Sequence, residues 1–277
     1  MQEQSLDGIV WSIDDHGIVR IVLDRPSEAN TMTLKAATAF AKAVGEIVAA
    51  SPRVVLLTGR GRMFCAGGDI GEFQQNMDRF DGLIDGILVA LHPAVVQLSG
   101  MPVPVVTAIN GSFGGAGLGL ALCGDFAYAA ASVKLRTGYI ALGLSPDAGS
   151  SYFLTRRIGT ARAKQLFFTN EALDASRMLA AGIVDAVFPD DRLMPEAEAL
   201  CERLAKTSTG SIGVIKTLCD GAERRSLSEH LALEKRLLED RARGPDAREG
   251  ISAFLEHRPA VFARQAESAI VAIPSKS

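Results

Sequence analysis

The stretch "VPVVTAINGSFGGAGLGLALCGD", from Val103 to Asp125, decides the fold because its pattern changes twice. It opens with a short run of apolar and β-branched residues, which is typical of a buried strand. Asn110-Gly111 and further glycines break this run, and the apolar residues that follow return at helical spacing. The stretch therefore predicts a strand, a glycine turn and a helix in direct succession.

An earlier glycine-rich turn, "TGRGRMFCAGGDI" from Thr58 to Ile70, follows the apolar run "VVLLTG". In chain order it is the first glycine turn, and the turn after Ile109 is the second. Residues without bulky side chains let backbone N–H groups come close to a ligand at the start of a helix. Two converging amides of this kind would form an oxyanion hole. Small residues would also allow a strand and a helix to pack tightly and do nothing more. The presence of two such turns, each after a buried strand, favours the oxyanion hole.

Several common glycine motifs are excluded. The second turn has Leu120 where a dinucleotide-binding fingerprint needs its last glycine. Neither turn contains the phosphate loop G-x-x-x-x-G-K-[ST], and no G-x-S-x-G nucleophile elbow surrounds Ser112. The turns are therefore not predicted to bind ATP or a dinucleotide, or to carry a serine nucleophile.

The flanking segments predict an α/β fold with a largely parallel, covered sheet. "GIVWSID" and "GIVRIVLD" flank the turn residues 14–17 and predict a β-hairpin. The remaining predicted elements are a helix over 33–50, strands at "VVLLTG", "FAYAA" and "VKLR", glycine-interrupted helices over 69–98, and two helices at "SSYFLTRRIG" and "ARAKQLFFT".

The chain becomes wholly helical in pattern beyond about Ser208. Ser226 with Glu229 predicts a capping box at the start of one helix, and Pro245 predicts the start of another. We therefore expect a core domain over 1–207 and a helical region over 208–277.

Composition excludes several classes of protein. The chain has 277 residues, 48% of them hydrophobic, and a net charge of −3 with the basic residues spread out, so no nucleic-acid partner is expected. Its start lacks the basic segment of a signal peptide, and no apolar run looks long and unbroken enough to span a membrane, so we expect a cytoplasmic protein without a membrane partner. The four cysteines form no C-x-x-C pair, which predicts neither a metal site nor disulfides.

Asp147 is the candidate acid or base. It follows a proline in "LGLSPDAGSSYF", between the apolar runs "IALGL" and "YFL". An aspartate here could simply cap a helix. A carboxylate between apolar runs would instead be desolvated, which would raise its pKa towards the working pH. No histidine pairs with a carboxylate motif, so surface or packing roles are expected for residues 16, 92, 230 and 257.

Taken together, "FCAGGDI", "INGSFGGAGLGLALCGD" and "GLSPDAGSSYFLTRRIG" resemble the enoyl-CoA hydratase/isomerase, or crotonase, superfamily. "LDRPSEANTM" and "FLEHRPAVF" extend the resemblance over nearly the whole chain. The resemblance implies a crotonase-like spiral of ββα turns with a helical C-terminal trimerisation region. It also implies a homotrimer or a dimer of trimers, an acyl-CoA substrate and no prosthetic group, with coenzyme A entering as part of the thioester.

The resemblance also implies binding residues. The family's oxyanion-hole amides fall on Gly68 and Ala116. Contacts to coenzyme A fall on Arg25 for phosphate, although a plain solvated charge is the alternative, and on backbone near Ala29, Ala66 and Gly68 for adenine and thioester. Two tail residues, His257 and Phe262, are expected to reach a neighbouring subunit's site, with histidine in place of the usual lysine. Candidates for the acyl pocket, which could equally be plain core, are Met77, Phe80, Leu83 and Ile87.

The family's hydratases hold water between two glutamates, and this chain has Gly119 and Tyr139 at those positions. Asp147 matches the aspartate of the ring-epoxide and enoyl-CoA isomerase branch of phenylacetate catabolism. One carboxylate suffices to take a proton from C2 of a 3-enoyl thioester and return it at C4. The main prediction is therefore an isomerase. Open alternatives are a dehalogenase-like aspartate nucleophile, a 2-enoyl-CoA hydratase with an unrecognised second group, and a catalytically silent coenzyme A-binding oligomer.

Overall fold

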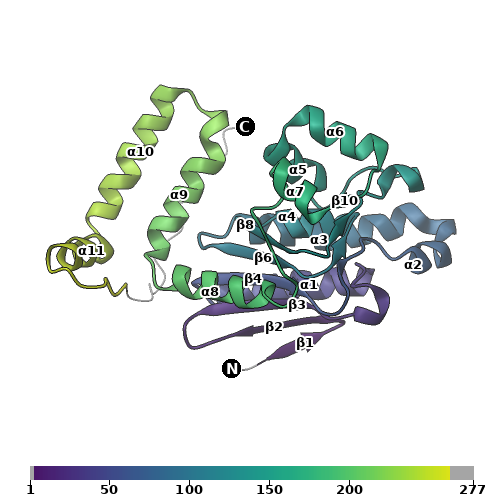
Figure 1. The fold of residues 1–277 in the computed structure, drawn as a ribbon, viewed down its shortest axis with the longest axis horizontal. Coiled ribbons are helices and arrows are strands. Elements are labelled where there is room, and N and C mark those ends of the chain that lie inside the picture. The colour runs from purple at the N-terminus through teal and green to yellow at the C-terminus, as the bar shows by residue number, and fades with distance from the viewer. Residues whose placement is uncertain (1–2, 263–277) are drawn as a thin grey trace. The chain divides into compact units, whose positions relative to one another are not determined.

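A computed structural model describes residues 3–262 of the chain. Contacts within the chain divide it into two compact units, Met1–Ala205 and Lys206–Ser277. The first unit holds two sheets and the helices α1 to α8, and the second holds α9 to α11 (Figure 1). Both sheets and all the predicted catalytic residues fall in the first unit.

The large sheet has seven strands in the order β1-β2-β3-β4-β6-β8-β11. The predicted hairpin is confirmed, since β2 and β3 pair antiparallel, and every pair from β3 to β11 is parallel. The strands are β1 Gln4–Leu6, β2 Ile9–Ile13, β3 Ile18–Leu23, β4 Val54–Gly59, β6 Val105–Ile109, β8 Phe126–Ala130 and β11 Ala186–Phe188. The predicted α/β fold with a mostly parallel sheet is therefore confirmed.

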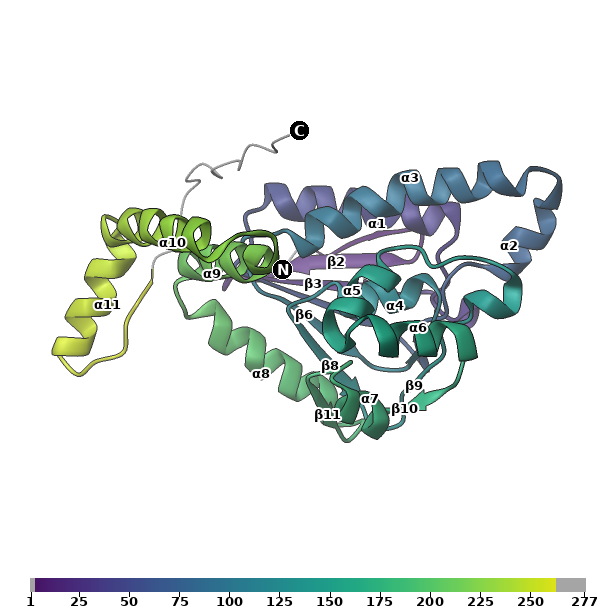
Figure 2. The same ribbon diagram turned by 90° about the horizontal axis from the view of Figure 1, so that it is seen from above.

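Helices cover both faces of the large sheet. α1 (Leu34–Ala49) lies beside α3 (Phe80–Ser99) on one face, and α8 (Leu193–Ala205) crosses the other (Figure 2). Thr33 caps α1 by accepting a hydrogen bond from the Ala36 N–H at 3.1 Å. Arg20 of β3 donates to both carboxylate oxygens of Glu198 at 2.7 and 2.6 Å, which attaches α8 to the sheet.

The expectation about membrane spans needs correction at α3. Gly82 and Gly86 do not interrupt this helix, so with the preceding turn it forms one stretch, Met77–Ser99, that is long and apolar enough to cross a membrane by length and composition. A single stretch of this kind is weak evidence, because core helices of globular proteins pass the same test. Here Leu91 and Leu98 are fully buried in the core.

A second, four-stranded sheet was not foreseen as a unit. Its order is β10-β9-β7-β5, with β5 parallel to β7 and β7 parallel to β9. The strands are β5 Met63–Cys65, β7 Ser112–Phe113, β9 Lys134–Leu135 and β10 Leu173–Asp174. Only "VKLR" was predicted, because two or three residues are too few to show an alternating pattern.

The remaining helices of the first unit are α2 Ile70–Gln75, α4 Ala116–Leu122, α5 Ser150–Ile158, α6 Thr160–Thr169 and α7 Ala175–Ala181. α4 is buried along its whole length and packs against α5. Its glycines allow this packing, since a Cβ on Gly117 would lie 2.2 Å from the Cys65 carbonyl oxygen. The tight-packing interpretation of the glycine run is therefore correct for this part of it.

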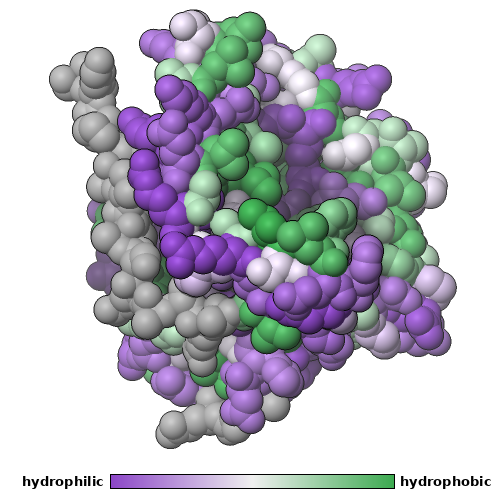
Figure 3. All heavy atoms as spheres, turned by 90° about the vertical axis from the view of Figure 1, so that its left-hand side faces the viewer, coloured by the Kyte–Doolittle hydropathy of each residue, from purple (hydrophilic) through white to green (hydrophobic). Residues whose placement is uncertain are grey.

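The second unit consists of helices α9 Thr209–Gly221, α10 Leu227–Ala242 and α11 Pro245–Leu255. The predicted capping box is present, with Ser226 and Glu229 bonded reciprocally, and α11 begins at the predicted proline. Large apolar side chains of α10 and α11 are exposed, among them Leu238 and Phe254. Figure 3 shows hydrophobic side chains interspersed with hydrophilic ones on one face of the molecule. The helical C-terminal segment is thus confirmed.

Candidate functional site

The small sheet brings the two glycine turns together. Because β5 and β7 run parallel, the residues that follow them emerge at the same edge. A Cβ built on Gly67 would lie 3.0 Å from the Cα of Gly115 and 3.3 Å from the amide nitrogen of Ala116. Gly67 and Gly115 also have φ angles of +98° and +52°, which other residues rarely adopt. Glycine is therefore required at both positions for this contact.

The predicted oxyanion-hole amides belong to these two turns. Gly68 lies next to Gly67, and Ala116 is the first residue of α4. Within residues 3–262, neither the Gly68 nor the Ala116 N–H donates a hydrogen bond to another protein group. The structure therefore brings two amides without protein acceptors into neighbouring turns.

Asp147 lies in the turn before α5, but its side chain does not cap that helix. Gly149 is the N-cap residue of α5, and no side chain accepts a hydrogen bond there. Only the backbone carbonyl of Asp147 takes part, accepting from the Ser150 N–H at 2.8 Å. The helix-cap interpretation of the carboxylate is therefore wrong, and the side chain is left for other contacts.

The carboxylate accepts a hydrogen bond from the Tyr139 hydroxyl, with 2.6 Å between Oη and Oδ1. Burial raises the pKa of Asp147, while the hydrogen bond from Tyr139 and the electrostatic effect of His92 act to lower it. The predicted direction of the pKa shift is confirmed. The predicted cause, desolvation, is also confirmed, although Ile140 and Leu142 of the preceding apolar run are more than half exposed.

Hydroxyl groups connect Asp147 to the second glycine turn. The Tyr139 Oη lies 3.0 Å from the Ser150 Oγ, and the Ser150 hydroxyl donates to the Gly115 carbonyl at 3.1 Å. Ser150 is fully buried and Tyr139 nearly so. Ser150, the first residue of α5, was not singled out in the sequence, where it is one serine among several.

His92 contacts the same turn from α3. Its Nε2 accepts a hydrogen bond from the Ala148 N–H at 3.2 Å, next to Asp147. The expected packing role is too narrow for a ring so placed, since it also influences the carboxylate. Nothing in the sequence could have revealed this contact, because 56 residues separate the two positions.

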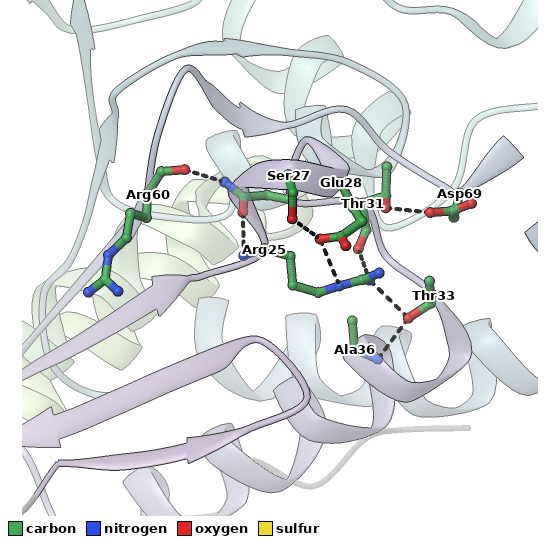
Figure 4. Close-up of polar contacts among 9 residues, drawn as sticks. Arg25, Ser27, Glu28, Thr31, Thr33, Ala36, Arg60 and Asp69 are labelled. Atoms are coloured by element: carbon green, nitrogen blue, oxygen red, sulfur yellow. Dashed lines mark hydrogen bonds and ion pairs between the residues drawn. The ribbon is translucent and has the colours of Figure 1, made fainter. Parts of the chain in front are cut away.

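The predicted coenzyme A contacts gather around the loop after β3, except for Phe262. Figure 4 shows Arg25 directed at its own loop, where its Nη1 donates to the Thr31 carbonyl at 3.0 Å and to the Thr33 hydroxyl at 3.1 Å. The Ala66 N–H donates to the Ala29 carbonyl at 3.1 Å, so this loop lies against the first glycine turn. Phe262 lies in the other unit.

An open pocket of about 440 Å³ adjoins Arg25 but not Asp147. Besides Arg25 and Lys35, its lining residues include four carboxylates, Asp7, Asp24, Glu28 and Glu72. Carboxylates repel a phosphate, and part of the Arg25 guanidinium is already bound to groups of its own loop. The charge around Arg25 is therefore less favourable for binding a phosphate than the sequence predicted.

The four acyl-pocket candidates differ in how deeply they are buried. Leu83 and Ile87 are buried in the core, whereas Met77 is 63% exposed. Phe80 packs edge-on against Phe73 of α2, with 5.1 Å between ring centroids. A Cβ on Gly68 would lie 2.3 Å from the Phe73 ring, so this phenylalanine, which the sequence analysis did not select, covers one side of Gly68.

In the part of the chain that the structure describes, no three His, Cys, Asp or Glu side chains are grouped as a metal site would need. Cys65 and Cys201 are buried, and burial raises the pKa of each thiol to about 12. Cys219 is exposed.

Comparison with known proteins identifies the family of this chain. The family model for enoyl-CoA hydratase/isomerase matches residues 14–265. The chain belongs to the enoyl-CoA hydratase/isomerase family. It is 35% identical to the 1,2-epoxyphenylacetyl-CoA isomerase of Escherichia coli over 252 residues, covering 90% of this chain and 95% of the relative. This finding confirms the resemblance to the superfamily and to its phenylacetate branch.

Other members of the family carry different names. The chain is 30% identical to the trans-2-decenoyl-acyl-carrier-protein isomerase of Streptococcus mutans, covering 92% of this chain and 97% of the relative. The solved structure of an enoyl-CoA hydratase from Bacillus anthracis superposes with a TM-score of 0.87 at 29% identity, covering 94% of this chain and all of that one. Membership in the family is therefore certain, and the choice between isomerase and hydratase rests on the site.

The resemblance implies that the family's hydratases have glutamates at positions 119 and 139, where this chain has glycine and tyrosine. A Cβ on Gly119 would lie 2.1 Å from the Ala148 carbonyl oxygen, so the turn that carries Asp147 fills the space a glutamate would need. At the other position the Tyr139 hydroxyl donates to Asp147. Asp147 thus occupies this region together with a tyrosine instead of with two glutamates.

Proposed function

We propose that this chain is an enoyl-CoA isomerase that shifts a double bond in an acyl-CoA or rearranges a ring-epoxide CoA. The observation that carries the proposal is the carboxylate of Asp147, which is largely buried, has a raised pKa and is linked by hydroxyls to the second glycine turn. The proposal assigns all proton transfer to this one group, because the two positions that hold glutamates in hydratases have glycine and tyrosine.

The thioester oxygen is held by the amides of Gly68 and Ala116. As a base removes a proton from C2, negative charge grows on this oxygen, and fixed N–H groups stabilise it without having to reorient. The loss of one donor of this kind typically raises the barrier by about 3 kcal/mol. The lack of protein acceptors for both amides supports this assignment.

Asp147 acts first as base and then as acid. Ionised, it takes the proton from C2 of a 3-enoyl thioester, and the electrons of the C–H bond pass into the conjugated enolate. The same carboxyl group then returns the proton at C4, which leaves the 2-enoyl product and the ionised enzyme. A raised pKa suits this double role, because the protonated and ionised forms are then closer in free energy.

The substrate's coenzyme A portion is assigned to the backbone near Ala29, Ala66 and Gly68, with Arg25 offered to phosphate through its remaining N–H groups. No prosthetic group is required. The proposal includes a homotrimer or a dimer of trimers, in which Phe262 serves a neighbouring subunit's site. The exposed apolar side chains of α10 and α11 support the assembly.

The test is to offer the purified protein 3-enoyl-CoA and 2-enoyl-CoA and to follow conjugation and water addition separately. Isomerisation is expected, and Asp147→Asn should lower it by roughly 10²- to 10⁴-fold, the range for a general acid or base. Strong hydration without isomerisation would identify a hydratase. Coenzyme A binding without any turnover would identify a silent scaffold. Full activity of Asp147→Asn would remove Asp147 from the chemistry.

A further inference from the structure

Four polar groups form a continuous chain from the Asp147 carboxylate to a backbone carbonyl. The Oδ1 of Asp147 lies 2.6 Å from the Tyr139 Oη, which lies 3.0 Å from the Ser150 Oγ, which lies 3.1 Å from the Gly115 oxygen. Both hydroxyls are almost inaccessible to water. Apart from the Asp147 N–H, which donates to the Tyr139 Oη at 3.3 Å, the hydrogens of these contacts come from the four groups themselves.

Counting hydrogens shows that the chain has two polarities. Each hydroxyl has one hydrogen to donate. When Asp147 is ionised, Tyr139 donates to it and the Ser150 hydroxyl donates to the Gly115 carbonyl, so no hydrogen lies between the two hydroxyl oxygens. When Asp147 is protonated, its carboxyl group donates to the Tyr139 hydroxyl. Tyr139 then donates to the Ser150 hydroxyl, and Ser150 donates to the Gly115 carbonyl. Only in the protonated state are all three contacts hydrogen bonds.

The last of these hydrogen-bonded groups is significant because the Gly115 carbonyl and the Ala116 N–H belong to the same peptide bond. A peptide unit is conjugated, and a hydrogen bond to its oxygen makes its N–H a stronger donor. The Ala116 N–H is the amide assigned above to the thioester oxygen.

We propose that Tyr139 and Ser150 are positioning residues whose reversible hydroxyl chain couples protonation of Asp147 to the donor strength of the Ala116 amide. The inference rests on the proposed function. As the C2–H bond breaks, its proton binds Asp147 and its electrons move to the thioester oxygen. The Tyr139 hydrogen turns from Asp147 to Ser150 at that moment, which strengthens the bond from Ser150 to the Gly115 carbonyl, so the amide becomes a better donor when the oxygen becomes negative. Return of the proton at C4 restores the first polarity.

Other titratable groups also face Asp147. His92 approaches from α3 and Cys65 from β5, and both interact electrostatically with the carboxylate. His92 Nε2 accepts from the Ala148 N–H, so in this arrangement its ring proton is on the other nitrogen. Neither side chain is a link in the hydroxyl chain, so neither is altered by the variants below.

The experiment compares Ser150→Ala with Ser151→Ala, an exposed neighbour on the same helix. Ser150→Ala keeps Asp147 and its bond to Tyr139 but removes the end of the chain. We expect kcat for isomerisation to fall by between about threefold and tenfold, the scale of one neutral hydrogen bond, with KM unchanged. Ser151→Ala should match the wild type, and thermal unfolding of each variant shows whether it is folded.

The pH dependence of kcat/KM gives a readout that a merely structural role would not move. Without Ser150, protonated Asp147 leaves the Tyr139 hydrogen without an acceptor, so the acid limb should shift to lower pH. Tyr139→Phe removes the donor to the carboxylate, so the limb should shift to higher pH. Opposite shifts support the coupling.

If Asp147→Asn is inactive while Ser150→Ala equals Ser151→Ala in rate and pH profile, the coupling is wrong and the proposed function stands. If Asp147→Asn is fully active, the proposed function itself fails.

Discussion

At the scale of single residues, the function depends on a carboxylate that the fold keeps partly desolvated. The pKa of Asp147 is raised mainly by burial, so the folded protein holds its proton to higher pH than the unfolded chain does. The stability that this group contributes is therefore present below the ordinary carboxyl pKa of 3.8 and is lost as pH rises through the folded value.

The first prediction concerns this pH dependence. The free energy of unfolding of Asp147→Asn, relative to wild type, should increase as pH rises from about 4 to about 7, because the variant has no charge to desolvate. Urea unfolding at several pH values measures it. Asp69→Asn is the control of opposite sign, since hydrogen bonding from the Glu72 N–H lowers the pKa of Asp69. Its free energy of unfolding relative to wild type should be nearly flat over this range and should increase only as pH falls below about 4. A flat difference for Asp147→Asn would contradict the burial argument.

The second prediction concerns Gly119. Gly119→Ala places a Cβ 2.1 Å from the Ala148 carbonyl oxygen, so either α4 or the Asp147 turn must move. We expect a loss of roughly 1–3 kcal/mol of stability, typical of overpacking, together with reduced activity. Gly45→Ala in α1 is the matched control, because no atom lies within 4 Å of the added carbon. That variant should gain up to about 1 kcal/mol from helix propensity, and chemical denaturation compares the two.

At the scale of elements, the parallel pairing of β5 with β7 brings the glycine turns together. Gly67→Ala adds a carbon 3.0 Å from the Gly115 Cα and forces a side chain onto a φ of +98°. The third prediction is that isomerase activity falls by at least about tenfold, as expected when an oxyanion-hole donor is displaced. Gly159→Ala carries similar backbone strain, at φ +78°, but has open space, so it should lose stability while retaining activity. Equal activity losses in both variants would contradict a specific role for the contact between the turns.

The same elements show what the sequence could predict. Hydrophobic period and turn chemistry were sufficient for the hairpin, for α1 and for the capping box at Ser226, because each signal is local. The two-residue strand β7 has no period, so the small sheet and the meeting of the turns had to come from the structure. Tyr139, Ser150 and His92 were missed as partners of Asp147 because their roles depend on distances in space. The cap interpretation failed because α5 begins three residues after Asp147.

At the scale of the whole molecule, the two units differ in how they bury apolar surface. The first unit encloses its core between helices and the large sheet. Each helix of the second unit has few buried residues, and α10 buries only Leu233 among its sixteen. A unit with so little core and so much exposed apolar surface is stabilised when that surface is covered. The proposed trimer would supply such a cover.

Phe254 of α11 offers the sharpest test of this assembly, since its side chain is 79% exposed in the single chain. If α11 packs against a neighbouring subunit, Phe254→Asp buries a charge without a partner, and the fourth prediction is a shift to smaller species in sedimentation velocity. Phe168→Asp is the matched control, because Phe168 is 71% exposed but lies on α6 of the other unit. The control should sediment like the wild type. A wild-type protein that sediments as a monomer would contradict the trimer, and the exposed face of α10 and α11 would then need another explanation.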